Sequence, residues 1–442
     1  MRSRAPNPRV QGVLAIGLAV LFVLVAGAAA LRFVDRSDRE SNPTPTALAL
    51  VTALPTSVLP ATPAVPPTET KPAAASPDVA PTPNPNDKWG SVIEQITSDK
   101  SAVMFRESIA RDGVVSGSAI TKKPGTAWST SLNDENYSVP AVLGKRIYVG
   151  GNDDTLKCLD ATTGEEIWDS KARDDISSSP AVGSGKVFFG SFDGNFYALN
   201  AENGKRAWRF ETSAPIHSSP AVDGSMVYFG GYDHVVYALS IADGTLVWAG
   251  ITGDQIQSSP ALSGKLVIIG SDDGKVYAFD RLTGKRRWQF DTGGKVTATP
   301  AIDGNKVIVA SESGTIYALS LKDGKEAWSF DTGSVVSFSS PAIASGMVFV
   351  GSDAGTLFAL DFTNGKEKWT ASAGAEIRSS PLYVGGTVYF GSYDGSLYAV
   401  DAKNGKQAWS LDLGGSVGSP VMADGVLYVS INSGTLSALK PD

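Results

Sequence analysis

The stretch SSPALSGKLVIIGSDDGKVYAFDRLTGKRRWQFD, from Ser258 to Asp291, contains a complete unit of a pattern that repeats along this chain. It holds four short runs of β-forming residues, separated by Ser-Gly-Lys, Asp-Asp-Gly and Leu-Thr-Gly. Apolar and aromatic runs bounded by Gly and Asp are typical of short strands joined by tight turns. A unit of about 40 residues with four strands predicts one blade of a β-propeller.

Two residue types mark the repeat along the rest of the chain. One tryptophan falls in each unit, at intervals of 40 or 41 residues: Trp128, Trp168, Trp208, Trp248, Trp288, Trp328, Trp369 and Trp409. One proline opens each unit: Pro140, Pro180, Pro220, Pro260, Pro300, Pro341, Pro381 and Pro420. Self-similarity at such a period is the signature of repeat architectures. Eight marks of each kind predict an all-β fold, an eight-bladed β-propeller of four-stranded antiparallel blades.

The two ends of the repeat region predict how the ring closes. The unit that starts at Pro420 has only three strand runs, whereas an extra run, TAWSTSL at 126–132, precedes the first unit. Pairing this N-terminal run with the last unit completes an eighth blade. Closure removes the exposed sheet edges that would otherwise pair with other chains.

The N-terminal region predicts a membrane segment and a stalk. Residues 10–31 carry no charge and follow three arginines, so they are long enough to form a transmembrane anchor with a cytoplasmic tail at 1–9. A signal peptide cleaved near Ala28–Ala30 is the alternative. Residues 32–103 are rich in Pro, Thr and Ala and predict a disordered stalk, with the propeller at 104–442. Both alternatives predict a propeller outside the cytoplasm, at the cell surface or in the periplasm.

Composition excludes several classes of function. The formal net charge is −7, of which the first 86 residues contribute +2 and the remainder −9. An acidic domain repels phosphate backbones, so nucleic acid is not expected as a partner. Cys158 is the single cysteine, which leaves no pair for a disulfide. His217 and His234 are the only histidines, and no Gly-x-Ser-x-Gly motif of a hydrolase is present.

One motif links the chain to a known family. The pattern A-x-D-x-x-T-G-K-x-x-W occupies Ala278–Trp288, with variants at Ala198–Trp208, Ala359–Trp369 and Ala399–Trp409. It resembles the tryptophan-docking repeat of the pyrroloquinoline-quinone (PQQ) propeller family. The resemblance extends from about Met104 onward, because MFRESIARDGVV resembles the segment that precedes the first strand in bacterial members.

That family has two branches with different functions. Quinoprotein dehydrogenases bind PQQ and calcium over the central channel, whereas other members resemble the propeller lipoprotein of outer-membrane protein assembly and are not enzymes. The adjacent Cys-Cys pair of the dehydrogenases is absent here, and the blades carry no long insertions. The resemblance therefore implies a binding scaffold without catalytic residues, metal or cofactor, in envelope protein assembly. A PQQ-dependent dehydrogenase is the alternative, with Asp272, Glu312 and Asp353 as the nearest carboxylates.

Candidate binding residues are expected where the repeats differ, because a common packing constraint makes the other positions alike. The third residue before each proline differs in every unit: Tyr137, Ser177, His217, Gln257, Thr297, Phe338, Arg378 and Val417. So does a position in the next loop: Asn152, Phe192, Tyr232, Asp272, Glu312, Asp353, Tyr393 and Asn432. Both loop classes emerge on one face of such a blade.

We predict that this face binds a protein, peptide or glycan, as mixed polar and aromatic surfaces do. The candidates are Tyr137, His217, Gln257, Arg378, Tyr232, Asp272, Glu312, Asp353 and Tyr393. Ordinary solvated loops are the alternative interpretation. The opposite face is richer in lysine, and the run at 126 should start there, so the chain is expected to enter the propeller from the lysine side.

Overall fold

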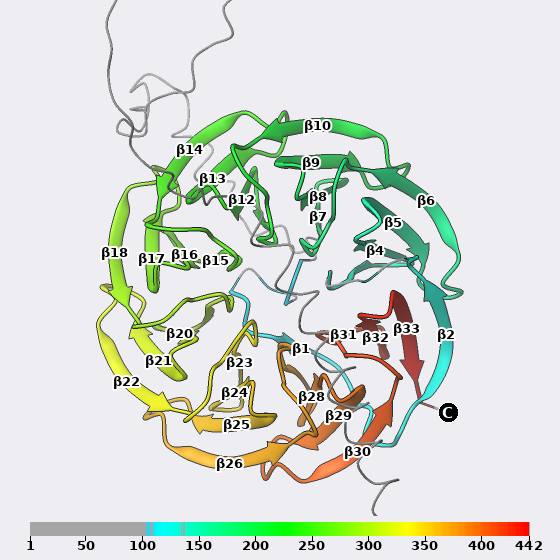
Figure 1. Ribbon diagram of the computed structural model, residues 1–442, viewed down its shortest axis with the longest axis vertical. Helices are drawn as coiled ribbons and strands as arrows, with labels where there is room; N and C mark the ends of the chain where they lie inside the picture. The colour runs from blue at the N-terminus through cyan, green and yellow to red at the C-terminus, as the bar shows by residue number, and fades with distance from the viewer. Residues whose placement is uncertain (1–103, 107, 109, 134, 136–137, 442) are drawn as a thin grey trace, which may run out of the picture. The chain divides into compact units, whose positions relative to one another are not determined.

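The computed structural model describes residues 104–441, apart from 107, 109, 134, 136 and 137, and folds them into eight antiparallel sheets around a central channel (Figure 1). The predicted eight-bladed propeller is therefore confirmed. The predicted tail, transmembrane segment and stalk, at 1–9, 10–31 and 32–103, lie outside the described residues. Within the described part of the chain, no helix has the length and apolar character needed to cross a membrane.

Blades 1 to 7 follow one another along the chain, each with four strands from the channel outward. Blades 1 to 4 are β3 (Ala141–Leu143), β4 (Arg146–Gly150), β5 (Thr155–Asp160), β6 (Glu166–Lys171); β7 (Ala181–Gly183), β8 (Lys186–Gly190), β9 (Asn195–Asn200), β10 (Arg206–Glu211); β11 (Ala221–Asp223), β12 (Met226–Gly230), β13 (Val235–Ser240), β14 (Leu246–Ile251); and β15 (Ala261–Ser263), β16 (Leu266–Gly270), β17 (Lys275–Asp280), β18 (Arg286–Asp291).

Blades 5 to 7 are β19 (Ala301–Asp303), β20 (Lys306–Ala310), β21 (Thr315–Ser320), β22 (Glu326–Asp331); β23 (Ala342–Ala344), β24 (Met347–Gly351), β25 (Thr356–Asp361), β26 (Glu367–Ser372); and β27 (Leu382–Val384), β28 (Thr387–Gly391), β29 (Ser396–Asp401), β30 (Gln407–Asp412). Blade 8 joins β31 (Val421–Ala423), β32 (Val426–Ile431) and β33 (Thr435–Lys440) to β2 (Gly125–Ser131). β2 pairs antiparallel with β33, placing Trp128 opposite Ala438, so the predicted closure is confirmed.

Burial differs between the inner and the outer strands of a blade. In blade 4, β17 is buried along five of its six residues, whereas β18 alternates and exposes four of six. The two middle strands are covered on both faces by the neighbouring blades, so they read as continuous apolar runs. The outer strand has one face in solvent and therefore alternates polar with apolar side chains.

Each tryptophan docks onto the next blade. The ring of Trp288 lies against Gly324 of blade 5, where an added Cβ would stand 2.6 Å from Trp288 Cε3. The indole N–H of Trp288 donates to the carbonyl of Leu321 at 3.0 Å. The glycine of the repeat is thus explained by space, because only glycine leaves room for the ring at a backbone φ of 71°.

A ring of hydroxyl groups links the inner ends of the blades. At seven of the eight junctions, the residue before the proline donates its backbone N–H to the side-chain oxygen of the equivalent residue in the next blade; the exception is the junction from Ser419 to Val139, which has no side-chain oxygen. Ser219 N lies 2.9 Å from Ser259 Oγ, and Ser340 N lies 3.1 Å from Ser380 Oγ. The same bond joins Val139 to Ser179, Ser179 to Ser219, Ser259 to Thr299, Thr299 to Ser340 and Ser380 to Ser419.

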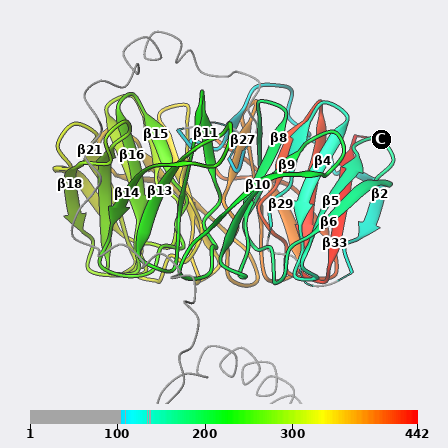
Figure 2. The same cartoon turned by 90° about the horizontal axis from the view of Figure 1, so that it is seen from above.

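Residues 104–124, the lead-in segment, pass through the channel before β2 begins. β1 (Val114–Val115) pairs in parallel with β27, the inner strand of blade 7. The carbonyls of Ala110 and Asp112 accept hydrogen bonds from Ile302 and Ile343, on the inner strands of blades 5 and 6. Figure 1 shows β1 inside the ring, and Figure 2 shows from the edge that the loops lie at the two ends of the blades.

Two buried arginines hold this segment to the blades. Arg111 is fully buried and donates to the carbonyls of Pro260 and Pro220, at 3.0 and 2.8 Å. Arg106 donates to the carbonyls of Ser340, at 2.8 Å, and Pro341. Burial lowers the pKa of both guanidinium groups. Their cost of burial is offset by hydrogen bonds to backbone carbonyls that would otherwise be unpaired.

The lead-in segment runs in the direction opposite to our expectation. Arg106 and Arg111 lie at the end where the inner strands begin, and β1 runs parallel to β27, so the segment descends toward the lysine face. At the lysine face, Trp409 Nε1 donates to the carbonyl of Ile120 at 2.8 Å. In other blades the acceptor of this bond lies in the turn between the third and fourth strands, and blade 8 has no such turn, because its fourth strand is β2. β2 does start at the lysine face. The described chain nevertheless begins at the opposite end of the channel, because residues 104–124 cross the channel before β2 begins.

Candidate functional site

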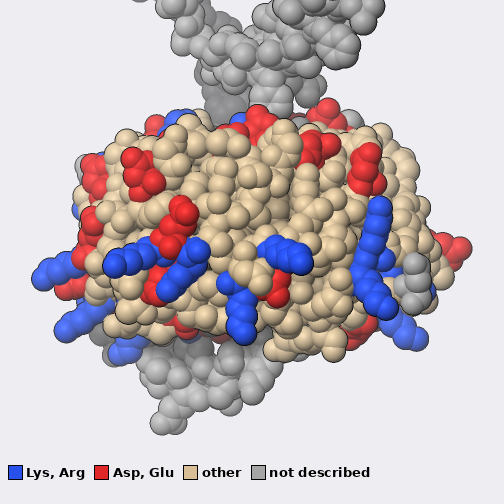
Figure 3. Space-filling model, turned by 90° about the horizontal axis from the view of Figure 1, so that it is seen from below, with Lys and Arg blue, Asp and Glu red and all other residues tan. Residues whose placement is uncertain are grey.

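The variable face is formed by the connections between blades together with the loops between the second and third strand of each blade. In sequence these loops contain 15 Asp and Glu against three Lys and Arg. The loops at the opposite end, the lysine face, contain ten Lys and Arg against five Asp and Glu. Figure 3 shows acidic side chains along the upper rim of the propeller and most basic ones across the lower half. The two faces therefore carry opposite charge.

Side chains from blade 4 and its neighbour form the first part of a polar arc on the variable face. Asp272, in the β16–β17 loop, accepts a hydrogen bond from Gln257 Nε2 at 2.8 Å. The same oxygen, Oδ2, lies 3.0 Å from Lys295 Nζ, which comes from the connection to blade 5. The Asp272 side chain is only 3% exposed, so this ion pair holds a carboxylate that is almost out of solvent.

The arc continues over blades 5, 6 and 7. Thr297 Oγ1 donates to Glu312 Oε1 at 3.0 Å. Arg378 Nη2 lies 3.1 Å from Asp353 Oδ2, and its guanidinium stands over the ring of Tyr393, 5.3 Å from the centroid. We call these residues the polar arc: Gln257, Asp272, Lys295, Thr297, Glu312, Asp353, Arg378 and Tyr393.

An aromatic cluster adjoins the arc at the channel mouth. The ring centroid of His217 lies 6.2 Å from that of Phe192 and 6.4 Å from that of Tyr232. Phe338, from the connection to blade 6, reaches the same histidine, with centroids 6.2 Å apart. Blades 2, 3 and 6 therefore meet through these four rings, which we call the aromatic cluster.

Burial shifts the pKa of one residue in each of the two groups, Glu312 in the polar arc and His217 in the aromatic cluster. Burial raises the pKa of the Glu312 carboxyl, and the negative charges of Asp272 and Asp353 raise it further, against Thr297 and Lys295. Burial lowers the pKa of His217, although a hydrogen bond that its ring donates to the backbone of Gln257 and the charge of Asp272 act in the opposite direction. Perturbed groups of this kind gather at functional sites more often than elsewhere.

Three buried polar atoms in these groups have no hydrogen-bond partner among the described residues: His217 Nδ1, Asp272 Oδ1 and Arg378 Nε. Such atoms are rare because each one costs free energy when it leaves water unpaired. Two of them, the carboxylate oxygen and the neutral imidazole nitrogen, are acceptors, and the third is a donor. Four other atoms of this kind lie elsewhere among the described residues: Trp168 Nε1, Asn195 Oδ1, Ser218 Oγ and Asp233 Oδ1.

The structure brings together eight of the nine predicted binding residues, in two groups linked by the charge interaction of His217 with Asp272. His217 and Tyr232 lie in the aromatic cluster. Gln257, Asp272, Glu312, Asp353, Arg378 and Tyr393 lie in the polar arc. Tyr137 lies outside the described residues. Whether any of them binds a partner stays a prediction.

Among the residues three positions before each proline, Val417 and Phe338 do not occupy the same place in the fold as the other members. Val417 is buried, and an added Cβ at Gly391 would meet it as one at Gly351 would meet Ile377, so Val417 fills a core position. Phe338 is an extra residue with φ 60°, inserted between the buried Val336 and the hydroxyl ring. Counting back from the proline misses both, because blade 8 has lost one residue in this connection and blade 6 has gained one.

Lys295 was missed by the sequence reasoning, although it forms the ion pair with Asp272. It occupies the position just before the buried apolar residue of its connection, where other units carry Asp175, Pro215, Gln255, Val335, Glu376 and Ser416. These residues differ between units as much as the residues at the two positions compared in the sequence analysis. Comparing this third position between units would have identified Lys295.

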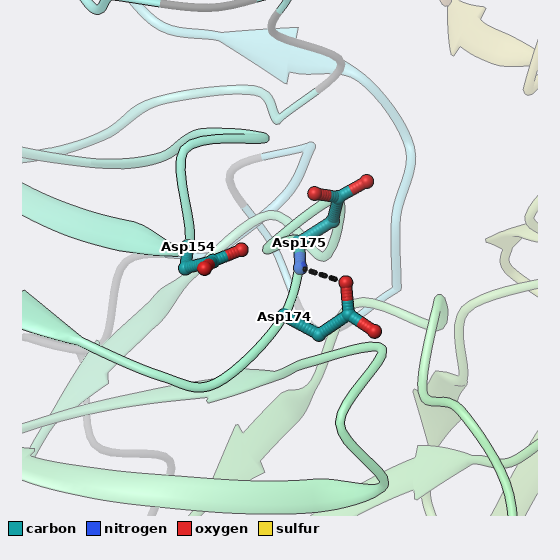
Figure 4. A group of neighbouring side chains, drawn as sticks. All are labelled: Asp154, Asp174 and Asp175. Carbon is teal, nitrogen blue, oxygen red and sulfur yellow. Dashed lines mark hydrogen bonds between the residues drawn. The ribbon is translucent and has the colours of Figure 1, made fainter.

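A group of three carboxylates lies elsewhere on the variable face. Asp154, Asp174 and Asp175 approach one another so that one oxygen of each lies within 4.8 Å of the others (Figure 4). The backbone N–H of Asp175 donates to Asp174 Oδ1 at 3.0 Å. Exposed acidic groups of this kind occur without a metal, and these residues are exposed or half-buried.

Comparisons with known proteins agree with the fold. The family model described as outer membrane protein assembly factor BamB matches residues 152–289 and 233–442. No curated protein matches the chain by sequence similarity.

Solved structures with a similar fold include a BamB protein, an alcohol dehydrogenase and a designed protein. BamB from Moraxella catarrhalis is 20% identical, with a TM-score of 0.62 over 72% of this chain and 99% of that one. The quinohemoprotein alcohol dehydrogenase from Comamonas testosteroni is 17% identical, with a TM-score of 0.67 over 79% of this chain and 82% of that one. The computationally designed Ika8 protein is 19% identical, with a TM-score of 0.63 over 72% and 100%. At such identities the likeness shows the fold alone.

Proposed function

Because the chain belongs to the family described as outer membrane protein assembly factor BamB, we propose that it is a non-catalytic binding scaffold that holds a protein partner on its variable face during envelope protein assembly. The observation that carries the proposal is the polar arc. Loops from blades 4 to 7 build it from side chains that differ between units, whereas the packing of the blades is nearly uniform. Tyr393 and Arg378 are of residue types that are enriched in the interfaces of protein complexes.

Crosslinking in cells tests this proposal. Tyr393 on the variable face and Leu282 on the lysine face are matched in exposure, at 38% and 37%. A photoreactive residue at position 393 is expected to capture a discrete protein, and one at position 282 is not. Equal capture from both positions, or capture from position 282 alone, would refute a partner on the variable face.

We further propose that residues 10–31 anchor the chain in the membrane and hold the propeller outside the cytoplasm. The support is the uncharged 22-residue segment preceded by arginines. The expected result is that the full-length chain stays in the membrane fraction after alkaline carbonate washing and that protease added outside reaches the propeller. Release of an N-terminally shortened chain would instead favour a cleaved signal peptide.

The described residues do not fit a quinone cofactor with calcium, the alternative that the dehydrogenase resemblance raises. The lead-in segment passes through the channel along the inner strands, and the cavity beside Phe105, Arg106, Pro381 and Pro420 has a volume of about 10 Å³, room for a single water molecule. Asp272 and Asp353 are each paired with a cation, and each of the three carboxylates comes from a different blade. We therefore derive no chemistry through PQQ.

Thermal unfolding with and without PQQ plus calcium checks this disagreement. A ligand at a hundredfold its dissociation constant adds about 2.7 kcal/mol to the free energy of unfolding. We expect no shift of the unfolding midpoint. A rise that a chelator abolishes would restore the dehydrogenase as the leading function.

A further inference from the structure

The polar arc has more negative than positive charge, and the excess falls on one residue. Lys295 pairs with Asp272, and Arg378 pairs with Asp353. Glu312 lies between these two pairs along the ring of blades. Among the described residues no Lys or Arg forms an ion pair with Glu312, whose side chain accepts a hydrogen bond from Thr297.

The environment of Glu312 disfavours its charge. The side chain is half-buried, and its desolvation outweighs the hydrogen bond from Thr297 and the charge of Lys295, while both neighbouring carboxylates act in the same direction as the desolvation. A half-buried carboxylate without an ion-pair partner is stabilised when a cation approaches, because the low local dielectric strengthens the attraction. Within the arc, an added positive charge is therefore stabilised most next to Glu312.

Exposed aromatic rings stand at the edge of the same surface. Phe338 is 37% exposed and Tyr393 is 38% exposed. Tyr393 already carries the guanidinium of Arg378 over its ring, which shows that the surface accommodates cation–π stacking. Phe338 lies at an inserted residue position with a left-handed backbone, a conformation that is unfavourable for a residue other than glycine.

Unpartnered polar atoms supply a second, independent sign of a ligand. The Asp272 side chain is only 3% exposed, and its Oδ1 has no hydrogen-bond partner among the described residues. His217 Nδ1 is a second acceptor without a hydrogen-bond partner among the described residues, and the charge of Asp272 acts on the same ring. Both atoms can accept a hydrogen bond from a ligand, whereas Arg378 Nε can donate one to an acceptor such as a backbone carbonyl. A peptide with a basic side chain provides both.

We propose that the polar arc recognises a lysine or arginine side chain presented by a segment of the partner protein, with Glu312 as its counter-ion and Phe338 and Tyr393 as flanking rings. This inference rests on the proposed function, because it names the chemistry of the scaffold's partner. A basic polypeptide also suits the whole face, since its 15 acidic residues against three basic ones extend well beyond the arc. A small cation would use Glu312 alone.

Selection of random dodecapeptides displayed on phage, with the full-length chain in detergent as the target, tests the proposal. We expect the selected peptides to be enriched in Lys and Arg. Their synthetic versions should bind Glu312→Gln at least about tenfold more weakly, the loss expected for a part-buried ion pair. Binding should also weaken when the ionic strength rises from about 0.1 M to about 1 M, because the Debye length falls from about 10 Å to about 3 Å.

A matched control separates the site from general charge. Glu367 is an exposed carboxylate on the outer strand β26, away from the variable face. Glu367→Gln should leave the affinity unchanged. Peptides without basic residues, or equal affinities for wild type and Glu312→Gln, would overturn the proposal. Spermidine that binds as tightly as the best peptide would overturn the choice of a polypeptide ligand.

The two levels of inference fail separately. If a photoreactive residue at position 393 still captures a protein while Glu312→Gln binds every selected peptide like wild type, the scaffold function stands and the basic side chain is refuted. If no protein is captured from the variable face in cells, the scaffold function itself is refuted, whatever peptides bind in detergent.

Discussion

Arg111 Nη2 lies 2.8 Å from the carbonyl oxygen of Pro220, although the two residues are 109 positions apart in the sequence. This bond attaches the lead-in segment to blade 3, and bonds from the same guanidinium reach Pro260 on blade 4. An arginine thus serves as a hub that satisfies carbonyls at the inner ends of two blades. The lead-in segment is therefore part of the propeller's interior rather than an appendage.

Replacing this hub should destabilise the whole domain. Arg111→Met keeps much of the side-chain volume but leaves the carbonyls of Pro220 and Pro260 buried without a donor. Each unsatisfied buried group costs about 1–3 kcal/mol, so the loss of both bonds should lower the free energy of unfolding by about 2–6 kcal/mol. Urea unfolding measures the loss. Arg173→Met, at an exposed position, is the control, and an equal effect of both changes would show that Arg111 is not a hub.

The contact between Trp288 and Gly324 predicts a difference between two glycines. Gly324 and Gly333 both have positive φ, at 71° and 68°, but only Gly324 lies under a ring. Gly333→Ala should cost about 1–2 kcal/mol for the left-handed backbone alone. Gly324→Ala adds a steric conflict with Trp288, which brings a further loss of about 1–3 kcal/mol. Similar midpoints for the two variants in urea would argue against ring docking as the reason for glycine.

The tryptophans are not equivalent in their hydrogen bonds. Trp288 Nε1 donates to Leu321, whereas Trp168 Nε1 is buried without a partner among the described residues. The carbonyl of Ala201, its expected acceptor, is occupied by Tyr148 and Arg146. Trp288→Phe should therefore cost about 1 kcal/mol more than Trp168→Phe, the net worth of one hydrogen bond. Thermal or urea unfolding of both variants decides, and a larger loss at Trp168 would contradict the assignment.

The raised pKa of Glu312 predicts how stability depends on pH. The folded protein keeps a proton on Glu312 in a range above the ordinary pKa of 4.5, where the unfolded chain has released it. Stability from this group is therefore full at low pH and falls as the pH rises through the folded-state pKa. Glu312→Gln should be more stable than wild type at neutral pH, and the difference should vanish toward pH 4. A difference that grows on acidification would show that the pKa is lowered instead.

The candidate site could be predicted from the sequence only where the repeat kept its register. Gln257, Asp272, Glu312, Asp353 and Arg378 follow from comparing equivalent positions, and all of them lie in the polar arc. Val417 was misplaced, because one residue is missing from its connection, so that it fills the core. The bonds that join Gln257 to Asp272 and Arg378 to Asp353 depend on distances between loops, which residue order does not contain.

Periodicity alone determined the number of blades, their four strands and the closure by β2, because each unit repeats the same local turn chemistry and the same apolar runs. The tertiary structure alone decided what fills the channel, in which direction the lead-in segment crosses it and which carboxylate lacks a cation. These features depend on contacts between residues more than a hundred positions apart. No local pattern encodes such contacts, since they arise only when the ring closes and brings the inner ends of the blades around one axis.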